Sequence, residues 1–177
     1  MAGADEWQRL WAPDRMRYIE GVDRPPHDGP GEQCPFCRSP SDPPAETLVV
    51  ARGRLVYAVL NKYPYNPGHL LICPYRHVAA YVELDHEETA EFAAMTRQAI
   101  KSLAEVSNPP GFNIGMNQGS AAGAGVAGHL HQHVVPRWAG DTNFMPVVGG
   151  TKVLPQLLAD TRVLLAAAWT NAEEERC

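Results

Sequence analysis

Apolar residues recur in five short stretches whose length and alternation predict β-strands. These stretches span residues 48–50, 55–60, 69–73, 111–116 and 129–136. The first two flank Arg52-Gly53, a pair suited to a tight turn, and therefore predict a hairpin. Pro74 is expected to end the third stretch, because proline cannot donate to a sheet ladder.

Two longer stretches show helical spacing instead. Residues 87–106 and 153–169 each place apolar side chains on one face, and acidic residues begin the first of them. The last residues, 171–177, are expected to fray. Strands combined with two main helices are typical of an α+β protein, so we expect an antiparallel sheet of about five strands.

The most informative feature lies in the fifth predicted strand, where His129, His131 and His133 occupy alternate positions. Successive side chains of a strand point to opposite faces, so the three imidazoles are expected on one face. Such a row can bind a metal, or can supply a nucleophile and proton carriers. Gln132 would face the other way and would need a hydrogen-bond partner of its own.

A segment of small residues precedes this strand. Residues 119–125 read Gly-Ser-Ala-Ala-Gly-Ala-Gly, which lets backbone N–H groups approach phosphate oxygens closely. A phosphate cradle leading into a row of histidines indicates chemistry at phosphorus.

Length, charge and cysteine content limit the domain number, the binding partners and the cellular compartment that we expect. The chain has 177 residues, enough for one domain with a sizeable core, and a formal net charge of −5. That charge disfavours a broad basic surface, so no nucleic-acid partner is expected. No apolar run reaches membrane-spanning length, and residues 1–17 lack the features of a signal peptide. The four cysteines include only one C-x-x-C pair, which suits a reducing compartment, and we expect a cytoplasmic protein.

Three segments together resemble a known family. Residues 60–69, 113–119 and 129–137 resemble, in this order, the motifs of the histidine triad (HIT) family of nucleotidyl hydrolases and transferases. The tail 136–146 resembles a bacterial branch assigned as diadenosine tetraphosphate phosphorylases (ATP adenylyltransferases). The resemblance implies a single HIT-like domain over 1–177. Its parts would be an N-terminal extension with a metal knuckle (1–46), a catalytic core (47–137) and a C-terminal loop and helix (138–177).

The resemblance also implies a mechanism. His131 would attack the α-phosphorus and form a nucleotidyl-histidine, a role that suits neutral imidazole. His129 and His133 would orient neighbouring groups or carry protons. Inorganic phosphate would then release the nucleotide, so that diadenosine tetraphosphate gives ATP and ADP. Water in place of phosphate would make the protein a hydrolase of dinucleoside polyphosphates or nucleoside phosphoramidates, which is the main alternative.

Further positions carry over to nucleotide binding. The residues expected near the ribose or the phosphates are Asn61, His69, Asn117, Gln118, Gly119, Ser120 and Gly125. Asn61 would bind the ribose hydroxyls or would instead cap a turn. Gly125 stands where relatives often carry Gln, Ser or Thr, and it leaves the choice between phosphate and water open. Trp138 would stack on a base or would be a half-buried interface residue.

The segment Cys34-Pro35-Phe36-Cys37 has the spacing of a metal knuckle, but a structural zinc needs four ligands. The resemblance completes the set with two histidines, here His77 and His129. Such a closed Cys2His2 site would hold a structural zinc and would pin the N-terminal loop to the catalytic strand. The alternative is a reduced cysteine pair beside a solvent-exposed His77.

Two other classes of function stay open. A nucleotide-binding or scaffold protein would keep the zinc knuckle without turnover, although an intact His131 argues against it. A metallohydrolase would use all three histidines on one zinc, which the C-x-x-C pair and the glycine loop disfavour. The expected partners are diadenosine polyphosphate, ATP or ADP, inorganic phosphate, and further copies of the chain in a homodimer or larger assembly.

Overall fold

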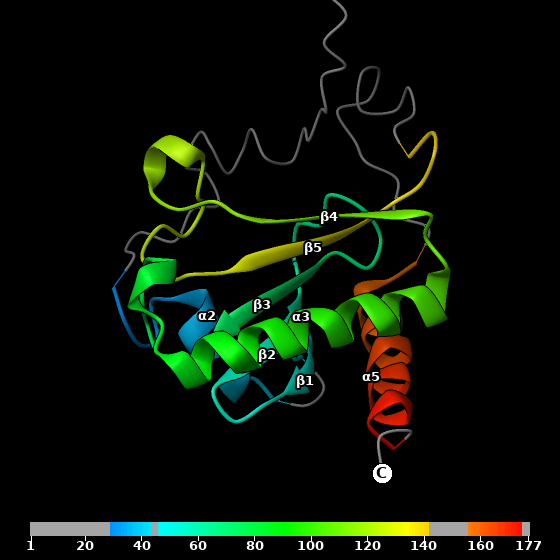
Figure 1. Ribbon diagram of the computed structural model, residues 1–177, viewed down its shortest axis with the longest axis horizontal. Helices are drawn as coiled ribbons and strands as arrows, with labels where there is room; N and C mark the ends of the chain where they lie inside the picture. Colours follow the sequence, from blue (N-terminus) through cyan, green and yellow to red (C-terminus); the bar gives the residue numbers. More distant parts are fainter. Residues whose placement is uncertain (1–28, 44–45, 142–155, 175–177) are drawn as a thin grey trace, which may run out of the picture.

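The computed structural model describes residues 29–43, 46–141 and 156–174, and its centre is a five-stranded antiparallel sheet (Figure 1). The strands are β1 (Val49–Arg52), β2 (Val56–Leu60), β3 (Leu70–Pro74), β4 (Gly111–Met116) and β5 (Gln132–Arg137). Their order across the sheet is β1-β2-β3-β5-β4, and each neighbouring pair is antiparallel. The predicted α+β class and the antiparallel sheet are confirmed.

Within the described residues, three helices and three short 3-10 turns accompany the sheet. They are α2 (Pro35–Arg38), α3 (His86–Ser107), α5 (Leu158–Glu174), η1 (Ser39–Ser41), η2 (Tyr81–Glu83) and η3 (Ser120–Ala122). Helix α3 begins at a capping box, in which the Asp85 carboxylate accepts from the Glu88 N–H at 2.8 Å and the Glu88 carboxylate accepts from the Asp85 N–H at 3.0 Å. Because α5 continues to Glu174, the predicted fraying is wrong for residues 171–174. Residues 153–155, 175–177 and the tail beyond residue 141 lie outside the described residues.

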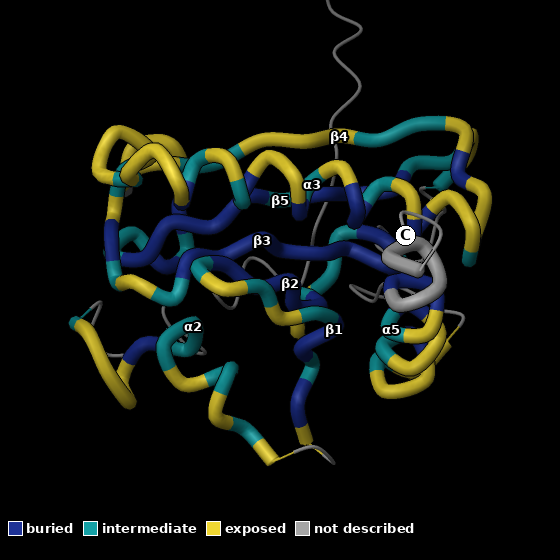
Figure 2. The backbone as a smooth tube through the Cα atoms, turned by 60° about the horizontal axis from the view of Figure 1, so that its bottom comes forward, coloured by how far each residue is buried: buried dark blue, intermediate teal, exposed yellow. Residues whose placement is uncertain are grey.

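The main hydrophobic core lies between one face of the sheet and the helices α3 and α5 (Figures 1 and 2). Its buried members on the strands are Val50, Val56, Ala58, Leu60, Leu70, Ile72 and Val134. Helix α3 adds Phe92, Met95, Ala99 and Leu103, and α5 adds Leu165 and Trp169. Burial of this much apolar surface fixes the sheet register, because a slip of one residue would turn every strand side chain to the other face.

A smaller cluster covers the opposite face of the sheet. It consists of Val49, Tyr57, Val59, Leu71 and Cys73, with the partly buried Phe36, Leu48 and Tyr75 packed against it. Cys73 is fully buried in this cluster. His133 pairs with Leu71 across the β3–β5 ladder, so its side chain shares this second face.

The histidine segment is less regular than predicted. Strand β5 begins at Gln132, so the strand prediction is wrong for residues 129–131. Residues 129 and 130 attach instead to the end of β3 and the loop after it. His129 Nε2 lies 2.9 Å from the Pro74 carbonyl oxygen, and the Leu130 N–H donates to the Val78 carbonyl at 2.6 Å. The expected partner of Gln132 is present on α3, where Thr96 Oγ1 accepts from Gln132 Nε2 at 2.8 Å.

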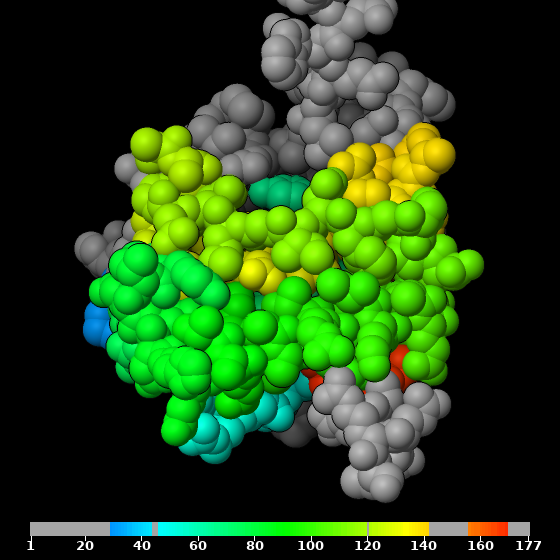
Figure 3. All heavy atoms as spheres, in the orientation of Figure 1, coloured from blue at the N-terminus to red at the C-terminus, as the bar shows by residue number. Residues whose placement is uncertain are grey.

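Strand β4 forms one edge of the sheet and lies along the surface above α3 (Figures 1 and 3). Its central side chains are exposed, including Ile114 at 48%. Within the described ranges, no helix is long and apolar enough to cross a bilayer.

Candidate functional site

His131 has the geometry of a nucleophile. It is only 6% exposed, and its Nδ1 lies 2.8 Å from the backbone carbonyl oxygen of His129. A carbonyl oxygen only accepts hydrogen bonds, so Nδ1 carries the proton and the lone pair of the neutral ring is on Nε2. Burial lowers the pKa of His131, against the opposing effect of this hydrogen bond, and so favours the neutral ring. A neutral imidazole with a directed Nε2 lone pair can attack phosphorus.

A chain of hydrogen bonds sets the proton position on His133, whose ring centroid is 5.1 Å from that of His131. His133 Nδ1 lies 2.9 Å from Nε2 of the fully buried His69. The Tyr65 backbone N–H donates to His69 Nδ1 at 3.1 Å, so neutral His69 carries its proton on Nε2 and donates it to His133. Neutral His133 then carries its own proton on Nε2, where it can donate a hydrogen bond to a neighbouring oxygen.

Asn61 contributes to the same chain. Its Nδ2 lies 3.4 Å from His69 Nδ1, and its Oδ1 accepts from the Tyr63 N–H at 2.9 Å. The second contact fixes which end of the amide faces His69. The turn-capping role considered for Asn61 is therefore present, and it places the amide beside the histidine chain.

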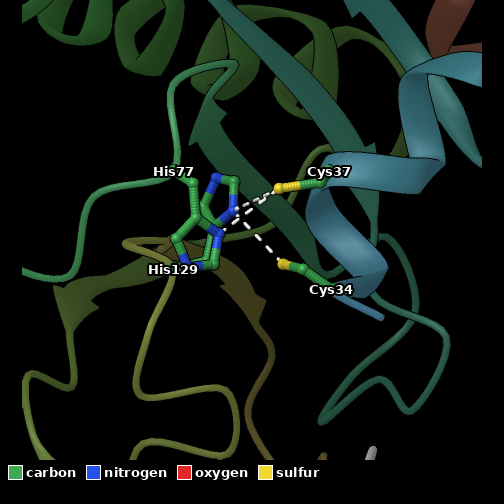
Figure 4. Close-up of side chains that lie close together, drawn as sticks. All are labelled: Cys34, Cys37, His77 and His129. Carbon is green, nitrogen blue, oxygen red and sulfur yellow. Dashed lines mark hydrogen bonds between the residues drawn. The ribbon is translucent and has the colours of Figure 1, made fainter. Parts of the chain in front are cut away.

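Four further side chains converge at the other end of the histidine segment (Figure 4). These are Cys34, Cys37, His77 and His129, whose candidate ligand atoms all lie within 4.8 Å of one another. Cys34 and Cys37 come from the short helix α2 and its N-cap, and His77 comes from the loop after β3. The structure thus brings together the residues predicted to bind zinc.

The donor set fits a tetrahedral zinc ion. With sulfur about 2.3 Å and nitrogen about 2.0 Å from the metal, neighbouring sulfur and nitrogen ligands should lie about 3.5 Å apart. The Sγ–Nδ1 distances are 3.3 Å for Cys34–His129, 3.3 Å for Cys37–His77 and 3.5 Å for Cys37–His129. Because His129 Nε2 donates to the Pro74 carbonyl, the lone pair of the ring is on Nδ1, the atom that faces the cysteines.

Burial changes the pKa values of two residues in this cluster. It lowers the pKa of His129 to about 4, and it raises the pKa of the Cys34 thiol to about 11. A neutral imidazole is already the form that ligates a metal, whereas the buried Cys34 thiol needs a nearby cation to become a thiolate. Both ring nitrogens of His129 are engaged, so its backbone carbonyl is the group that reaches His131.

The glycine-rich loop begins beside the histidines. Met116, the last residue of β4, pairs with Gln132, so Asn117 and Gln118 follow at the end of the sheet where His131 lies. Gln118 Oε1 accepts from the Tyr81 N–H at 2.8 Å, which ties the start of the loop to η2. Gly119 has a φ of 78°, a conformation that favours glycine, and its carbonyl accepts from the N–H groups of residues 122 and 124. Ser120 opens the η3 turn, and Gly125 is half-buried further along.

Trp138 lies at the opposite end of β5 from His131. The intervening strand residues, at about 3.3 Å each, separate the two by roughly 20 Å. The turn that holds Trp138 is fixed by Asp141, which accepts from Arg137 Nη2 at 3.0 Å and from Asn66 Nδ2 at 2.7 Å. A side chain at this distance from His131 is not in position to touch the group that His131 attacks.

Two aromatic residues next to the histidines were not predicted. Phe36 lies between the knuckle cysteines with its ring 4.7 Å from that of His131, and Tyr65 stacks on His133 at 5.8 Å. The knuckle spacing points to the cysteines alone, and the hydrogen bond from Tyr65 is made by its backbone. No residue-type pattern could therefore have identified either contact.

An antiparallel sheet that carries a buried histidine beside a second, hydrogen-bonded histidine defines an α+β protein with a candidate histidine site. The sequence profile of the HIT domain matches residues 43–140. The chain belongs to the HIT family.

Particular relatives narrow the comparison. The chain is 53% identical over 169 residues to AP-4-A phosphorylase of Mycobacterium tuberculosis, which covers 94% of this chain and 87% of that protein. A Zn-bound histidine triad family protein from Mycobacterium smegmatis has a similar structure, with a TM-score of 0.64 and 26% identity over 80% of this chain and 96% of that chain. A hypothetical histidine triad nucleotide-binding protein from Sulfolobus tokodaii gives a TM-score of 0.65 at 25% identity, over 79% of this chain and 94% of that chain.

Proposed function

We propose that the protein cleaves diadenosine tetraphosphate with inorganic phosphate and releases ATP and ADP. The observation that carries the proposal is the His131 geometry, a buried neutral ring with its lone pair on Nε2. The 53% identity to a mycobacterial AP-4-A phosphorylase over 94% of the chain supports the choice of substrate.

In the first step, His131 Nε2 attacks the α-phosphorus of one adenosine. A phosphorus–nitrogen bond forms, the bond to the bridging oxygen breaks, and ATP leaves. The Nε2–H of His133 would donate a hydrogen bond to that departing oxygen, which leaves as the ionised terminal phosphate of ATP, and His69 holds His133 in the required tautomer. His131 then carries the adenylyl group as a phosphoramidate.

In the second step, inorganic phosphate attacks the adenylyl phosphorus. The phosphorus–nitrogen bond breaks, ADP leaves, and His131 returns to its neutral form. Backbone N–H groups of the 119–125 loop, with Asn117, would bind the phosphoryl oxygens in both steps. Asn61 would hold the ribose near His69.

We also propose that Cys34, Cys37, His77 and His129 hold one structural zinc ion. Four protein ligands leave no open position, so the metal would brace the fold rather than touch the substrate. Its effect on the chemistry would pass through His129, whose carbonyl accepts from His131 Nδ1. Zinc would therefore stabilise the residue that fixes the tautomer of the nucleophile.

The alternative is hydrolysis, in which water takes the place of phosphate. A relative from Schizosaccharomyces pombe named bis(5'-nucleosyl)-tetraphosphatase (asymmetrical) is 32% identical over 98 residues, but it covers only 55% of this chain and 53% of that protein. Gly125 is the position where the choice would be made, because it offers only a backbone N–H to the second reactant.

Product analysis separates the two reactions. The purified protein is incubated with diadenosine tetraphosphate, with and without inorganic phosphate, and the nucleotides are separated. ATP plus ADP formed only with phosphate is the expected result, whereas AMP plus ATP formed without phosphate would establish a hydrolase. His131→Ala should abolish turnover, and the matched control is His86→Ala, which removes an exposed histidine at the start of α3.

The setting of the reaction is part of the same proposal. We propose a cytoplasmic homodimer or larger homo-oligomer without a nucleic-acid partner. The net charge of −5 supports the absence of a nucleic-acid partner, and the exposed edge strand β4 supports contact with further copies of the chain. Light scattering at two protein concentrations would measure the assembly directly.

A further inference from the structure

A side chain of the metal knuckle lies directly against the proposed nucleophile. The ring centroids of Phe36 and His131 are 4.7 Å apart with an interplanar angle of 37°. The same Phe36 ring meets the ring of His129 edge-on at 5.6 Å. Phe36 therefore touches both a member of the Cys2His2 cluster and the histidine that attacks the substrate.

Several contacts hold Phe36 in place. It is enclosed in the helical turn of α2 between two cluster residues, Cys34 and Cys37. Its backbone carbonyl accepts from the Tyr57 hydroxyl at 2.6 Å, and its side chain packs against the buried cluster on that face of the sheet. A ring fixed in this way is a rigid surface for its neighbours.

The His131 ring needs such a surface. Its Nδ1–H donates to the His129 carbonyl, which fixes the tautomer and one corner of the ring. The direction of Nε2 also depends on what packs against the faces and edges of the ring. His133 meets the ring at an angle of 66°, and Phe36 covers it at 37°.

We propose that Phe36 is a positioning residue that sets the direction of the His131 Nε2 lone pair. The metal knuckle then orients the nucleophile in two ways, through the His129 carbonyl and through the Phe36 ring. The kinetic part of this inference rests on the proposed function, whereas the orientation of the ring can be tested without substrate.

Three variants separate positioning from general stability. Phe36→Ala removes the ring, and Phe36→Leu restores an apolar contact. The control, Leu48→Ala, removes a half-buried apolar side chain of the same cluster just before β1, which β2 and β3 separate from β5. Each variant is measured for zinc content, for single-turnover transfer of the nucleotide to the protein, and for KM.

With zinc bound, Phe36→Ala should slow nucleotide transfer about 100-fold, because a displacement of about 1 Å in a reacting group has an effect of that order. KM should change far less, Phe36→Leu should recover part of the rate, and Leu48→Ala should transfer at the wild-type rate. A zinc-loaded Phe36→Ala protein with the wild-type rate would overturn the proposal. So would a loss of rate that added Zn²⁺ restores in full, because Phe36 would then serve only to retain the metal.

Ring NMR signals of His131, recorded at one fixed pH, provide a readout that needs no substrate. Single sharp signals are expected in the wild type and in Leu48→Ala, and exchange broadening in Phe36→Ala. Sharp single signals in Phe36→Ala would overturn the positioning role. If the wild type fails to turn over diadenosine tetraphosphate while these signals behave as expected, the proposed function fails and the role of Phe36 stands.

Discussion

Replacing Asp141 by Asn should destabilise the protein in a way that depends on pH. The Asp141 side chain is 10% exposed and pairs with the Arg137 guanidinium. It also accepts from Asn66 Nδ2 at 2.7 Å and from the Trp138 N–H at 3.4 Å. The carboxylate thus joins the end of β5 to the loop before His69, and Asn cannot supply its charge to Arg137.

The magnitude follows from the pKa of this carboxyl. The Arg137 guanidinium, helped by Asn66 and the Trp138 N–H, lowers the pKa of Asp141 from 3.8 to about 2, against the opposing effect of burial. One pH unit of such lowering is worth about 1.4 kcal/mol, so the charged form contributes about 2 kcal/mol to the free energy of unfolding at neutral pH. Because the folded pKa lies below the unfolded one, this contribution is complete above about pH 4 and is lost as the pH falls through about 2.

Urea unfolding of the wild type and Asp141→Asn at about pH 7, about pH 4 and about pH 2.5 measures this dependence. The difference between the two proteins should be about 2 kcal/mol at the first two values and should shrink at the third. The control is Asp42→Asn, since Asp42 makes a surface contact of 3.8 Å to the exposed Arg38, and a change below about 1 kcal/mol is expected there. A cost for Asp141→Asn that is equal at all three pH values would refute the electrostatic reasoning.

Four further substitutions test other parts of the structure. Cys37→Ser should lower the bound zinc per chain and the thermal midpoint together, and a normal metal content would contradict the ligand set. His69→Leu removes the donor to His133 at similar bulk and should lower kcat about 100-fold with little change in KM, as steady-state assays would show. Glu88→Gln replaces a buried carboxylate, which accepts from Arg76 at 2.6 Å, by a neutral amide, and calorimetry should find the free energy of unfolding lower by about 1–3 kcal/mol. Gly68→Ala should cost about 1–2 kcal/mol in urea unfolding, because φ is 78° and a Cβ would lie 2.9 Å from a Leu103 methyl carbon; an unchanged midpoint would count against that strain.

Local sequence patterns were enough to predict the helices and strands that bury one face. The helical spacing of 87–106 predicted α3 to within a residue at each end, because its apolar side chains and its acidic first turn act within the segment itself. The alternation around Gln132 predicted correctly that this side chain leaves the histidine face, and Thr96 on α3 receives it. The hairpin of β1 and β2 follows from the same kind of local information.

The same reasoning failed where residues remote in the sequence supply the hydrogen-bond partners of a segment. Alternation extended the last strand back to His129, but Leu130 bonds to Val78 and the His129 ring bonds to Pro74. The predicted end of the last helix, residue 169, was also wrong, because α5 continues to Glu174 through the polar residues that were expected to fray. Boundaries of this kind depend on partners that are remote in the sequence.

For the site, the sequence by itself determined which residue types are present and, with the family motifs, which of them to group. Cys34, Cys37, His77 and His131 could be named from spacing and resemblance. What only the tertiary structure decided is what each ring nitrogen does, because a tautomer is set by the hydrogen bond made at the other nitrogen. The Pro74 carbonyl of β3 holds the His129 proton on Nε2, so that Nδ1 faces the cysteines. The Tyr65 backbone N–H acts through His69 and sets the proton position on His133. Those donors and acceptors are backbone groups that nearly every residue carries. Only the folded chain decides where they lie, and the residue types do not indicate it.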